Sequence, residues 1–276
     1  MKRAKLTLVG AGPGDPELIS LKGVKALSEA DVVLYDALVH PDLLTHAPED
    51  SKKIFVGKKK GVCQFPQEDI NRLIVEYALS CGHVVRLKGG DPFIFGRGHE
   101  ELLHAQAFNI ETHIVPGISS SIAVPELQQI PLTRRGINDS FWVLTGTTRN
   151  HELSQDIEVA AKSNATIVIL MGMTKLKEIA EVFSKEGKGE TPVAVIQNGS
   201  LPEEKMVLGT VNNIAQITNE QGISSPAIIV IGEVVSLHPD FIYEYTHSHT
   251  NSFEPEAKVV VNSKLKDFYN KLLRWK

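Results

Sequence analysis

The sequence predicts an α/β protein. Three observations indicate this class: short apolar runs typical of strands recur along the chain, amphipathic segments typical of helices separate the earlier runs, and glycine-rich turns follow two of the strands. A chain of 276 residues, of which 42% are hydrophobic, can bury a full core as one large domain or as two smaller ones.

The first half of the chain alternates between strand-like and helix-like segments. Strands are expected at LTLVG, DVVLYD, KKIFVG, HVVRLK and ETHIV, and helices at residues 21–29, within PQEDINRLIVEYALSCG and at residues 98–107. In the second of these helices, Pro66 and the acids after it suit a helix start, apolar side chains recur on one face, and Gly82 suits the end. This rhythm is typical of an α/β domain.

A second series of strands begins after VPGISSS. Its members are FWVLTG, ATIVILMG, TPVAVIQNG, EKMVLGT and SPAIIVIG. Because Val115-Pro116-Gly117 would interrupt a continuing element, we expect one domain over residues 1–115 and another over residues 116–245. Residues 246–276 are expected to form a polar tail that ends in an amphipathic helical pattern.

Charge and cysteine content exclude several functional classes. The net charge of −4 provides no basic field for nonspecific nucleic-acid binding. No apolar run reaches the roughly 18 residues of a membrane helix, and the first one ends too soon for a signal core, so we expect a cytoplasmic protein without membrane partners. Cys63 and Cys81 are too few for a disulfide framework or a zinc cluster, and His247 and His249 in the tail are not expected to bind metal.

The first strand runs into GAGPGDP, residues 10–16. A dinucleotide fingerprint requires G-x-G-x-x-G, but Asp15 stands where the third glycine would be. Pro13 and Pro16 remove two N–H groups that could bind a phosphate, and no G-K-[ST] follows. The turn therefore favours neither a dinucleotide nor a P-loop nucleotide, and alone it is equally typical of a plain strand-to-helix connection.

A second turn, within RLKGGDPFIFGRG, also combines glycines with an acid. Gly89 and Gly90 permit close approach of a ligand to the backbone, and Asp91 offers a carboxylate. S-adenosylmethionine suits such a site because it has hydroxyl and ammonium groups, a cationic sulfur and no phosphate. We expect the two turns to form a binding crevice at the strand ends, although capping of a turn is the commoner role of an aspartate such as Asp91.

Eight segments in chain order resemble the tetrapyrrole methylase family, most closely its uroporphyrinogen-III C-methyltransferases: GAGPGDPELISLKG, VVLYDALV, VGKKKG, VVRLKGGDPFIFGRG, VPGISSS, IPLTRRG, LMGM and SPAIIVIGEVV. The resemblance runs from about Lys5 to Val235. It implies two α/β domains with the S-adenosylmethionine site in the cleft between them, and a homodimer.

The resemblance also implies the residues of the donor site: Pro13, Gly89, Gly90, Asp91, Ile94, Ser119, Ser120, Met171, Gly199 and Ala227. By residue type alone, Ile94 and Met171 are more typical of a core. Ser119 and Ser120 stand where relatives often carry Thr-Ala, a small-for-small exchange.

Two further residues resemble the acid–base positions of the family. Asp36, after the second strand, resembles the proton acceptor, and Lys58, in VGKKKG, resembles the proton donor. By residue type alone, Lys58 would be a solvated cation in a run of three lysines.

The reaction implied is transfer of two methyl groups from S-adenosylmethionine to C2 and C7 of uroporphyrinogen III. The products are precorrin-2, for sirohaem or cobalamin synthesis, and S-adenosyl-L-homocysteine, and no metal is required. The substrate carries eight carboxylates, so cations in or beside the motifs are candidates to bind it, although about half of them are expected to be solubilising surface charges instead: Arg86, Lys88, Arg97, Arg134, Arg135 and Arg149. Arg134 and Thr147 stand where relatives often carry histidine, which bears on the substrate rather than on the donor.

Two alternatives remain at this stage. One is a tetrapyrrole methylase that acts later, on a precorrin carbon. The other is a nucleotide-binding regulatory protein without catalysis, in which Asp36 and Lys58 would be dispensable.

Overall fold

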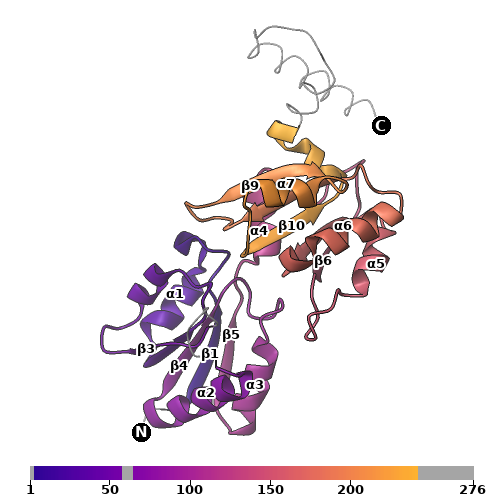
Figure 1. Ribbon diagram of the computed structural model, residues 1–276. Coiled ribbons are helices and arrows are strands. Elements are labelled where there is room, and N and C mark those ends of the chain that lie inside the picture. The colour runs from indigo at the N-terminus through magenta and orange to yellow at the C-terminus, as the bar shows by residue number, and fades with distance from the viewer. Residues whose placement is uncertain (1–2, 58–64, 242–276) are drawn as a thin grey trace, which may run out of the picture. The chain divides into compact units, whose positions relative to one another are not determined.

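The computed structural model describes residues 3–57 and 65–241, which form ten strands and seven α-helices in two compact units. The first unit holds the chain up to Val124 together with Asn198–Glu204, and the second holds Pro125–Gln197 and the described residues from Lys205 onward. The α/β class is confirmed (Figure 1). The domain limits expected at residues 115 and 116 stay a prediction, and the tail expected over residues 246–276 lies outside the described residues.

The first unit contains a five-stranded parallel sheet in the order β3-β2-β4-β1-β5. Its strands are β1 (Lys5–Gly10), β2 (Val32–Tyr35), β3 (Lys52–Phe55), β4 (His83–Lys88) and β5 (Glu111–Val115). Since all these pairs are parallel, the carboxyl ends of the strands lie along one edge. The strands that carry the two glycine-rich turns, β1 and β4, are neighbours in this sheet (Figure 1).

Helices cover both faces of this sheet. One face packs on α2 (Gln67–Cys81) and α3 (Gly98–Ala107), and the other on α1 (Leu21–Ser28) and the 3-10 helix η2 (Pro41–His46). Side chains alternate between the faces along each strand, so Leu8 joins the first core cluster and Val9 the second. At the end of α2, Gly82 has a φ of 117°, a conformation that favours glycine.

The second unit contains a mixed sheet in the order β6-β7-β10-β8-β9. Its strands are β6 (Phe141–Thr145), β7 (Thr166–Leu170), β8 (Pro192–Gln197), β9 (Lys205–Thr210) and β10 (Ala227–Ile231). β6 and β7 are parallel, whereas β10 runs antiparallel to both β7 and β8. A single core cluster joins this sheet to α5 (Asp156–Ala161), α6 (Leu176–Lys185) and α7 (Ile214–Glu220).

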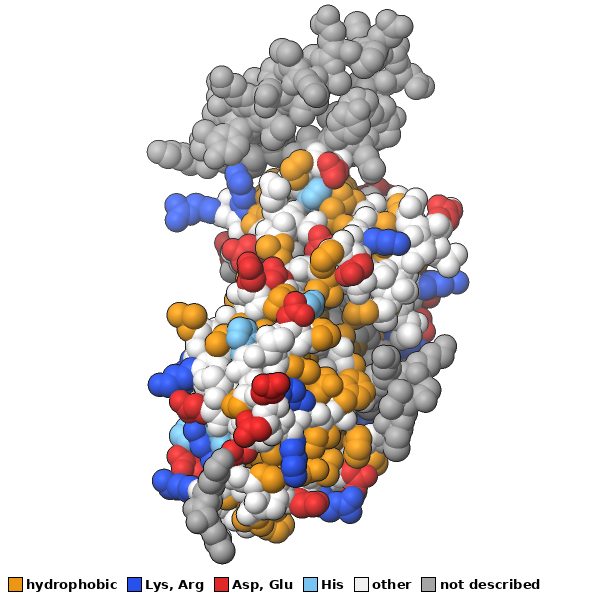
Figure 2. Space-filling view, turned by 90° about the vertical axis from the view of Figure 1, so that its left-hand side faces the viewer, with side chains coloured by type: hydrophobic (Ala, Val, Ile, Leu, Met, Phe, Trp, Pro, Cys, Tyr) orange, Lys and Arg blue, Asp and Glu red, His pale blue; other side chains and the backbone are white. Residues whose placement is uncertain are grey.

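The remaining elements are short. The division between the units falls inside α4 (Ser120–Leu127), and the other 3-10 helices are η1 (Pro16–Leu18), η3 (Met173–Lys175) and η4 (Glu233–Leu237). Within the described ranges, no helix has the length and apolar character required to cross a bilayer. On the face drawn in Figure 2, side chains of both charges are interspersed, without a broad field of one sign.

Candidate active site

The two glycine-rich turns are hydrogen-bonded to each other at the carboxyl edge of the first sheet. The Ala11 amide donates to the Lys88 carbonyl over 2.7 Å, the Gly12 amide to the Gly90 carbonyl over 3.3 Å, and the Gly90 amide to the Gly12 carbonyl over 2.7 Å. The expectation that the turns lie together is therefore confirmed.

Close backbone packing explains why glycine is required here. A Cβ atom on Gly10 would lie 2.4 Å from Gly117 Cα and 2.7 Å from the Gly90 carbonyl oxygen. Gly90 has a φ of +65°, and a Cβ there would meet nothing closer than the Ser120 amide nitrogen at 4.0 Å. Backbone atoms thus pack closely between Gly10, Gly117 and the Gly90 carbonyl, whereas the space that a Gly90 side chain would occupy is open. A ligand could approach the backbone at this point.

Asp91 caps the second turn with both of its carboxylate oxygens. Oδ1 accepts from the Phe93 amide over 2.8 Å, and Oδ2 accepts from the Gly117 amide over 3.1 Å. The capping role considered from sequence is therefore present. Because each carboxylate oxygen can accept more than one hydrogen bond, binding of a ligand by Asp91 stays a prediction.

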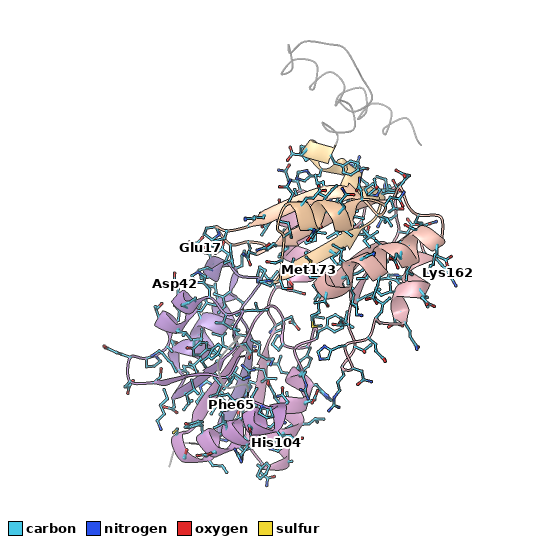
Figure 3. All side chains as sticks on the ribbon, viewed as in Figure 1. Glu17, Asp42, Phe65, His104, Lys162 and Met173 are labelled. Carbon is cyan, nitrogen blue, oxygen red and sulfur yellow. The ribbon has the colours of Figure 1, made fainter. Side chains whose placement is uncertain are left out.

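The first turn is held by a segment from much later in the chain. The Asp15 side chain accepts from the amide of Glu17, labelled in Figure 3, over 2.9 Å and so caps η1. The Asp15 amide donates to Ser200 Oγ over 3.0 Å. A Cβ on neighbouring Gly199 would lie 2.4 Å from Val124 Cγ1. Sequence reasoning selected Gly199 by resemblance but missed Ser200, which no local pattern distinguishes.

The other expected donor-site residues differ in exposure. Ser119 is buried and its hydroxyl hydrogen-bonds to the Ser121 hydroxyl over 2.8 Å, while Ser120 begins α4. Ile94 is 44% exposed, so the core role that its residue type favoured is wrong. The structure places Pro13 in the first turn, partly buried.

Two expected donor-site residues belong to the second unit. Met171, directly after β7, is 52% exposed and has a φ of 55°. Its carbonyl accepts from Thr147 Oγ1 over 3.2 Å. The core role favoured for Met171 by residue type is therefore also wrong. Ala227 is the first residue of β10 and pairs with Gln197 of β8.

Asp36 follows β2 at the same sheet edge as the two turns, and its amide donates to the Leu87 carbonyl over 3.3 Å. The Arg86 guanidinium donates from Nη2 to Asp36 Oδ1 over 2.5 Å, and Lys88 Nζ lies 3.7 Å from Asp36 Oδ2. The Asp36 side chain remains 27% exposed. The proposed proton acceptor is therefore oriented by two cations and still open to solvent.

Arg86 and Lys88 are themselves buried, 2% and 3% exposed. Alternation along β4 directs both toward α2 and α3, where Glu101 Oε1 accepts from Arg86 Nε over 3.1 Å and from Lys88 Nζ over 3.0 Å. The expectation that Arg86 and Lys88 bind substrate carboxylates is therefore wrong, since internal acids occupy both. Sequence reasoning missed Glu101, because the acids after GRG look like an ordinary exposed start of a helix.

Burial and neighbouring charges together shift the pKa values of the two cations in opposite directions. Burial lowers the pKa of Lys88, and the Arg86 charge lowers it further, although Glu101 and Asp36 oppose the shift. Burial also acts to lower the pKa of Arg86, but attraction to Glu101 and Asp36 outweighs it and the pKa is raised.

The remaining candidate cations are more accessible. Arg97 is 53% exposed and paired with Glu100 over 2.6 Å. Arg135 and Arg149, in the second unit, are exposed, and Arg134 is partly buried. Lys58 lies outside the described residues. The described part of the chain contains no group of three or more His, Cys, Asp or Glu that could hold a metal.

Comparison with known proteins places most of the described chain in one family. Residues 5–215 match the model of the Tetrapyrrole (Corrin/Porphyrin) Methylases. The chain belongs to this family.

Two curated relatives are similar to most of the chain. The chain is 46% identical over 235 residues to the uroporphyrinogen-III C-methyltransferase of Methanocaldococcus jannaschii, covering 84% of this chain and 97% of that relative. It is 43% identical to the siroheme synthase of Actinobacillus pleuropneumoniae over 87% of this chain, but spans only 49% of that protein.

Two solved structures extend the comparison. The uroporphyrin-III C-methyltransferase of Thermus thermophilus, complexed with S-adenosyl homocysteine, is 37% identical with a TM-score of 0.73, covering 84% of this chain and 99% of that one. A cobalt precorrin-4 methyltransferase is 28% identical with a TM-score of 0.76, covering 84% and 96%.

The turns of this methylase fit an S-adenosyl group better than a phosphate. The first turn carries Asp15 and two prolines but no lysine or arginine, and the second presents Asp91 beside open backbone at Gly90. Acids and backbone carbonyls attract ammonium, sulfonium and hydroxyl groups, whereas a pyrophosphate would be repelled.

Proposed function

We propose that this protein is an S-adenosylmethionine-dependent uroporphyrinogen-III C-methyltransferase that methylates C2 and C7 of uroporphyrinogen III to give precorrin-2. The observation that carries the proposal is 46% identity across 97% of an enzyme of that name. A later tetrapyrrole methylase is the second candidate, but identity to the cobalt precorrin-4 enzyme is only 28%.

S-adenosylmethionine supplies a methyl group bonded to a cationic sulfur. In this proposal its binding involves the expected set from both units: Pro13, Gly89, Gly90, Asp91, Ile94, Ser119, Ser120, Met171, Gly199 and Ala227. The support within the first unit is the open backbone at Gly90 and the two carboxylates of the turns. S-adenosyl-L-homocysteine would leave as the second product.

Asp36 is proposed as the proton acceptor. Its Oδ1 is engaged by Arg86 at 2.5 Å, whereas Oδ2 lies 3.7 Å from Lys88, beyond hydrogen-bond distance. Oδ2 is therefore the oxygen that would take a proton from the substrate, and the fixed Oδ1 would keep it aimed. Lys58 is proposed as the proton donor on resemblance alone.

The finer assignments also rest on family resemblance. We propose a cytoplasmic homodimer whose partners are S-adenosylmethionine and uroporphyrinogen III, with no nucleic acid or membrane involved. Precorrin-2 precedes both sirohaem and cobalamin, and the half-length match to siroheme synthases is compatible with either product.

The test is methyl transfer by the purified protein. We expect two labelled methyl groups per uroporphyrinogen III, and a fall in kcat of roughly 10²–10⁴ in Asp36→Asn, the range for losing a general base. Asp42→Asn, at an exposed position of η2 (Figure 3), also removes one carboxylate charge and is expected to retain activity. No transfer to uroporphyrinogen III, with transfer to a precorrin, would favour the later methylase; no transfer to either would favour a non-catalytic binding protein.

A further inference from the structure

The first unit buries a cluster of four charged side chains, here called the β4 charge cluster: Asp36, Arg86, Lys88 and Glu101. Glu101 is fully buried, and the two cations are almost so, while Asp36 alone reaches solvent. The formal charges sum to zero, because two cations face two carboxylates. Taking such groups out of water costs several kcal/mol per ion, and apolar residues of similar volume often stabilise a fold as well or better. Stability alone therefore does not explain the cluster.

Glu101 is the inner end of the cluster. Its Oε1 accepts from Arg86 Nε, from Lys88 Nζ and from Gln67 Nε2 over 3.1, 3.0 and 3.1 Å, so one oxygen joins β4 to α2 and α3. Among the described residues, its other oxygen, Oε2, is buried without a hydrogen-bond partner. A buried acceptor left unsatisfied costs about 1–3 kcal/mol, and more if charged. Natural folds retain such groups mainly where they serve a site.

The geometry of the cluster is directional. Arg86 uses Nε for Glu101 and Nη2 for Asp36, so the planar guanidinium links the two carboxylates rigidly. Lys88 Nζ stands 3.0 Å from Glu101 and 3.7 Å from Asp36. Both cations thus bind the fully buried Glu101 on one side and lie close to the partly exposed Asp36 on the other. Glu101 therefore sets the positions of the two cations that act on Asp36, and its negative charge opposes theirs.

We propose that Glu101 is a positioning residue for the methyl-transfer reaction: it anchors Arg86 and Lys88 so that they orient Asp36 and limit how strongly they hold its negative charge. The inference rests on the proposed function, with Asp36 as the proton acceptor. Glu101 is fully buried and touches no reactant itself; it acts by anchoring the two cations and by opposing their charge.

Glu101→Gln tests the proposal because it keeps an oxygen at the acceptor position of Oε1, places an amide nitrogen at the unpartnered Oε2 position and removes the negative charge. Without that anion, the two cations act on Asp36 unopposed and hold its negative charge more strongly, so its carboxylate becomes a weaker base. Lys88, whose pKa burial already lowers, loses one of the two carboxylates that raise it and becomes neutral at lower pH. Among the described residues, Arg86 and Lys88 are the charged groups in contact with Asp36, so the acidic limb of the pH–rate profile, which reports the base, depends on this cluster.

We expect Glu101→Gln to lower kcat at least about tenfold with little change in KM, and to displace the acidic limb of the pH–rate profile to lower pH. A merely structural role would lower the unfolding temperature and leave the position of the profile unchanged. The matched control is Glu178→Gln on α6, which removes one carboxylate charge and breaks an exposed ion pair with Lys175. It is expected to leave the profile in place.

A second pair of variants covers the case in which Glu101→Gln does not fold. Lys88→Met combined with Glu101→Gln removes one charge of each sign and keeps the cluster neutral. Relative to Lys88→Met alone, the double variant is expected to show the same displacement of the acidic limb to lower pH, and coincident acidic limbs would overturn the proposal. If the wild-type protein transfers no methyl group, the proposed function fails instead, so the two failures are distinguishable.

Discussion

At the scale of single residues, neighbours decide what a side chain does. Arg86 and Arg97 lie in the same glycine-rich motif, yet Arg86 is 2% exposed and bound to two internal acids, whereas Arg97 is 53% exposed. Residue type and motif membership made them equal candidates for binding the substrate. The two arginines differ in environment because Arg86 lies on the face of β4 that packs on α3, where its side chain meets Glu101.

His83 gives a prediction at this scale. Its Nδ1 lies 2.9 Å from the Glu29 carbonyl oxygen, which can only accept, so Nδ1 carries the proton and Nε2 accepts from the Thr7 hydroxyl at 2.8 Å. Burial lowers the pKa of His83 below its ordinary value. Below about pH 6.5 the unfolded chain therefore binds more protons at this histidine than the folded chain does, so the free energy of unfolding decreases as the pH falls from about 6.5 toward the lower folded-state pKa.

We expect His83→Gln to reduce the loss in unfolding free energy between about pH 7 and about pH 5 in urea titrations. His46→Gln, an exposed histidine at the end of η2, is the control and should keep the wild-type difference. An unchanged difference in His83→Gln would contradict the assignment.

At the scale of elements, the site is built where strand ends meet. The carboxyl ends of β1, β4 and β5 bring Gly10, Gly90 and Gly117 so close that no side chain fits between them. The turns are therefore one unit of structure rather than two independent loops. A substitution in one turn should displace the other.

Gly10→Ala tests this coupling. The added Cβ would lie 2.4 Å from Gly117 Cα, and backbone cannot move aside as a flexible side chain can, so we expect a loss of about 3 kcal/mol in unfolding free energy and weaker binding of S-adenosylhomocysteine. The control is Gly187→Ala: that Cβ would meet nothing within 4 Å, and its φ of +77° should cost only about 1 kcal/mol. Equal losses in the two variants, or unchanged binding by Gly10→Ala, would refute the coupling.

At the scale of the whole molecule, a ligand that binds only the folded chain stabilises it by mass action. S-adenosylhomocysteine at 100 times its Kd should raise the unfolding free energy by about 2.7 kcal/mol. Asp91→Asn keeps an acceptor for one backbone amide but loses the charge, so we expect its Kd to rise roughly tenfold or more and the stabilisation to shrink at the same ligand concentration.

Calorimetric titration of Asp91→Asn beside Asp139→Asn measures this effect. Asp139 is exposed in the second unit, and its variant should bind as the wild type does. Wild-type affinity in Asp91→Asn would leave Asp91 with its capping role alone.

The sequence by itself determined the order of the strands and of the first three α-helices, because apolar periodicity and glycine or proline punctuation are local properties. It also disfavoured a phosphate cradle in the first turn, since Asp15 adds a negative charge there and two prolines remove N–H groups. The family motifs identified the candidate donor-site residues and Asp36 in advance.

Only the tertiary structure decided which charges face one another. The pairing of Asp36 with Arg86, the burial of Lys88 and Glu101, and the place of Ser200 beside the first turn depend on contacts between residues distant in sequence. The antiparallel course of β10 was equally hidden, because a run of apolar residues such as AIIVI is the same in either direction. Local patterns set which elements form, but long-range packing sets what surrounds each charge, and the surroundings determine its chemistry.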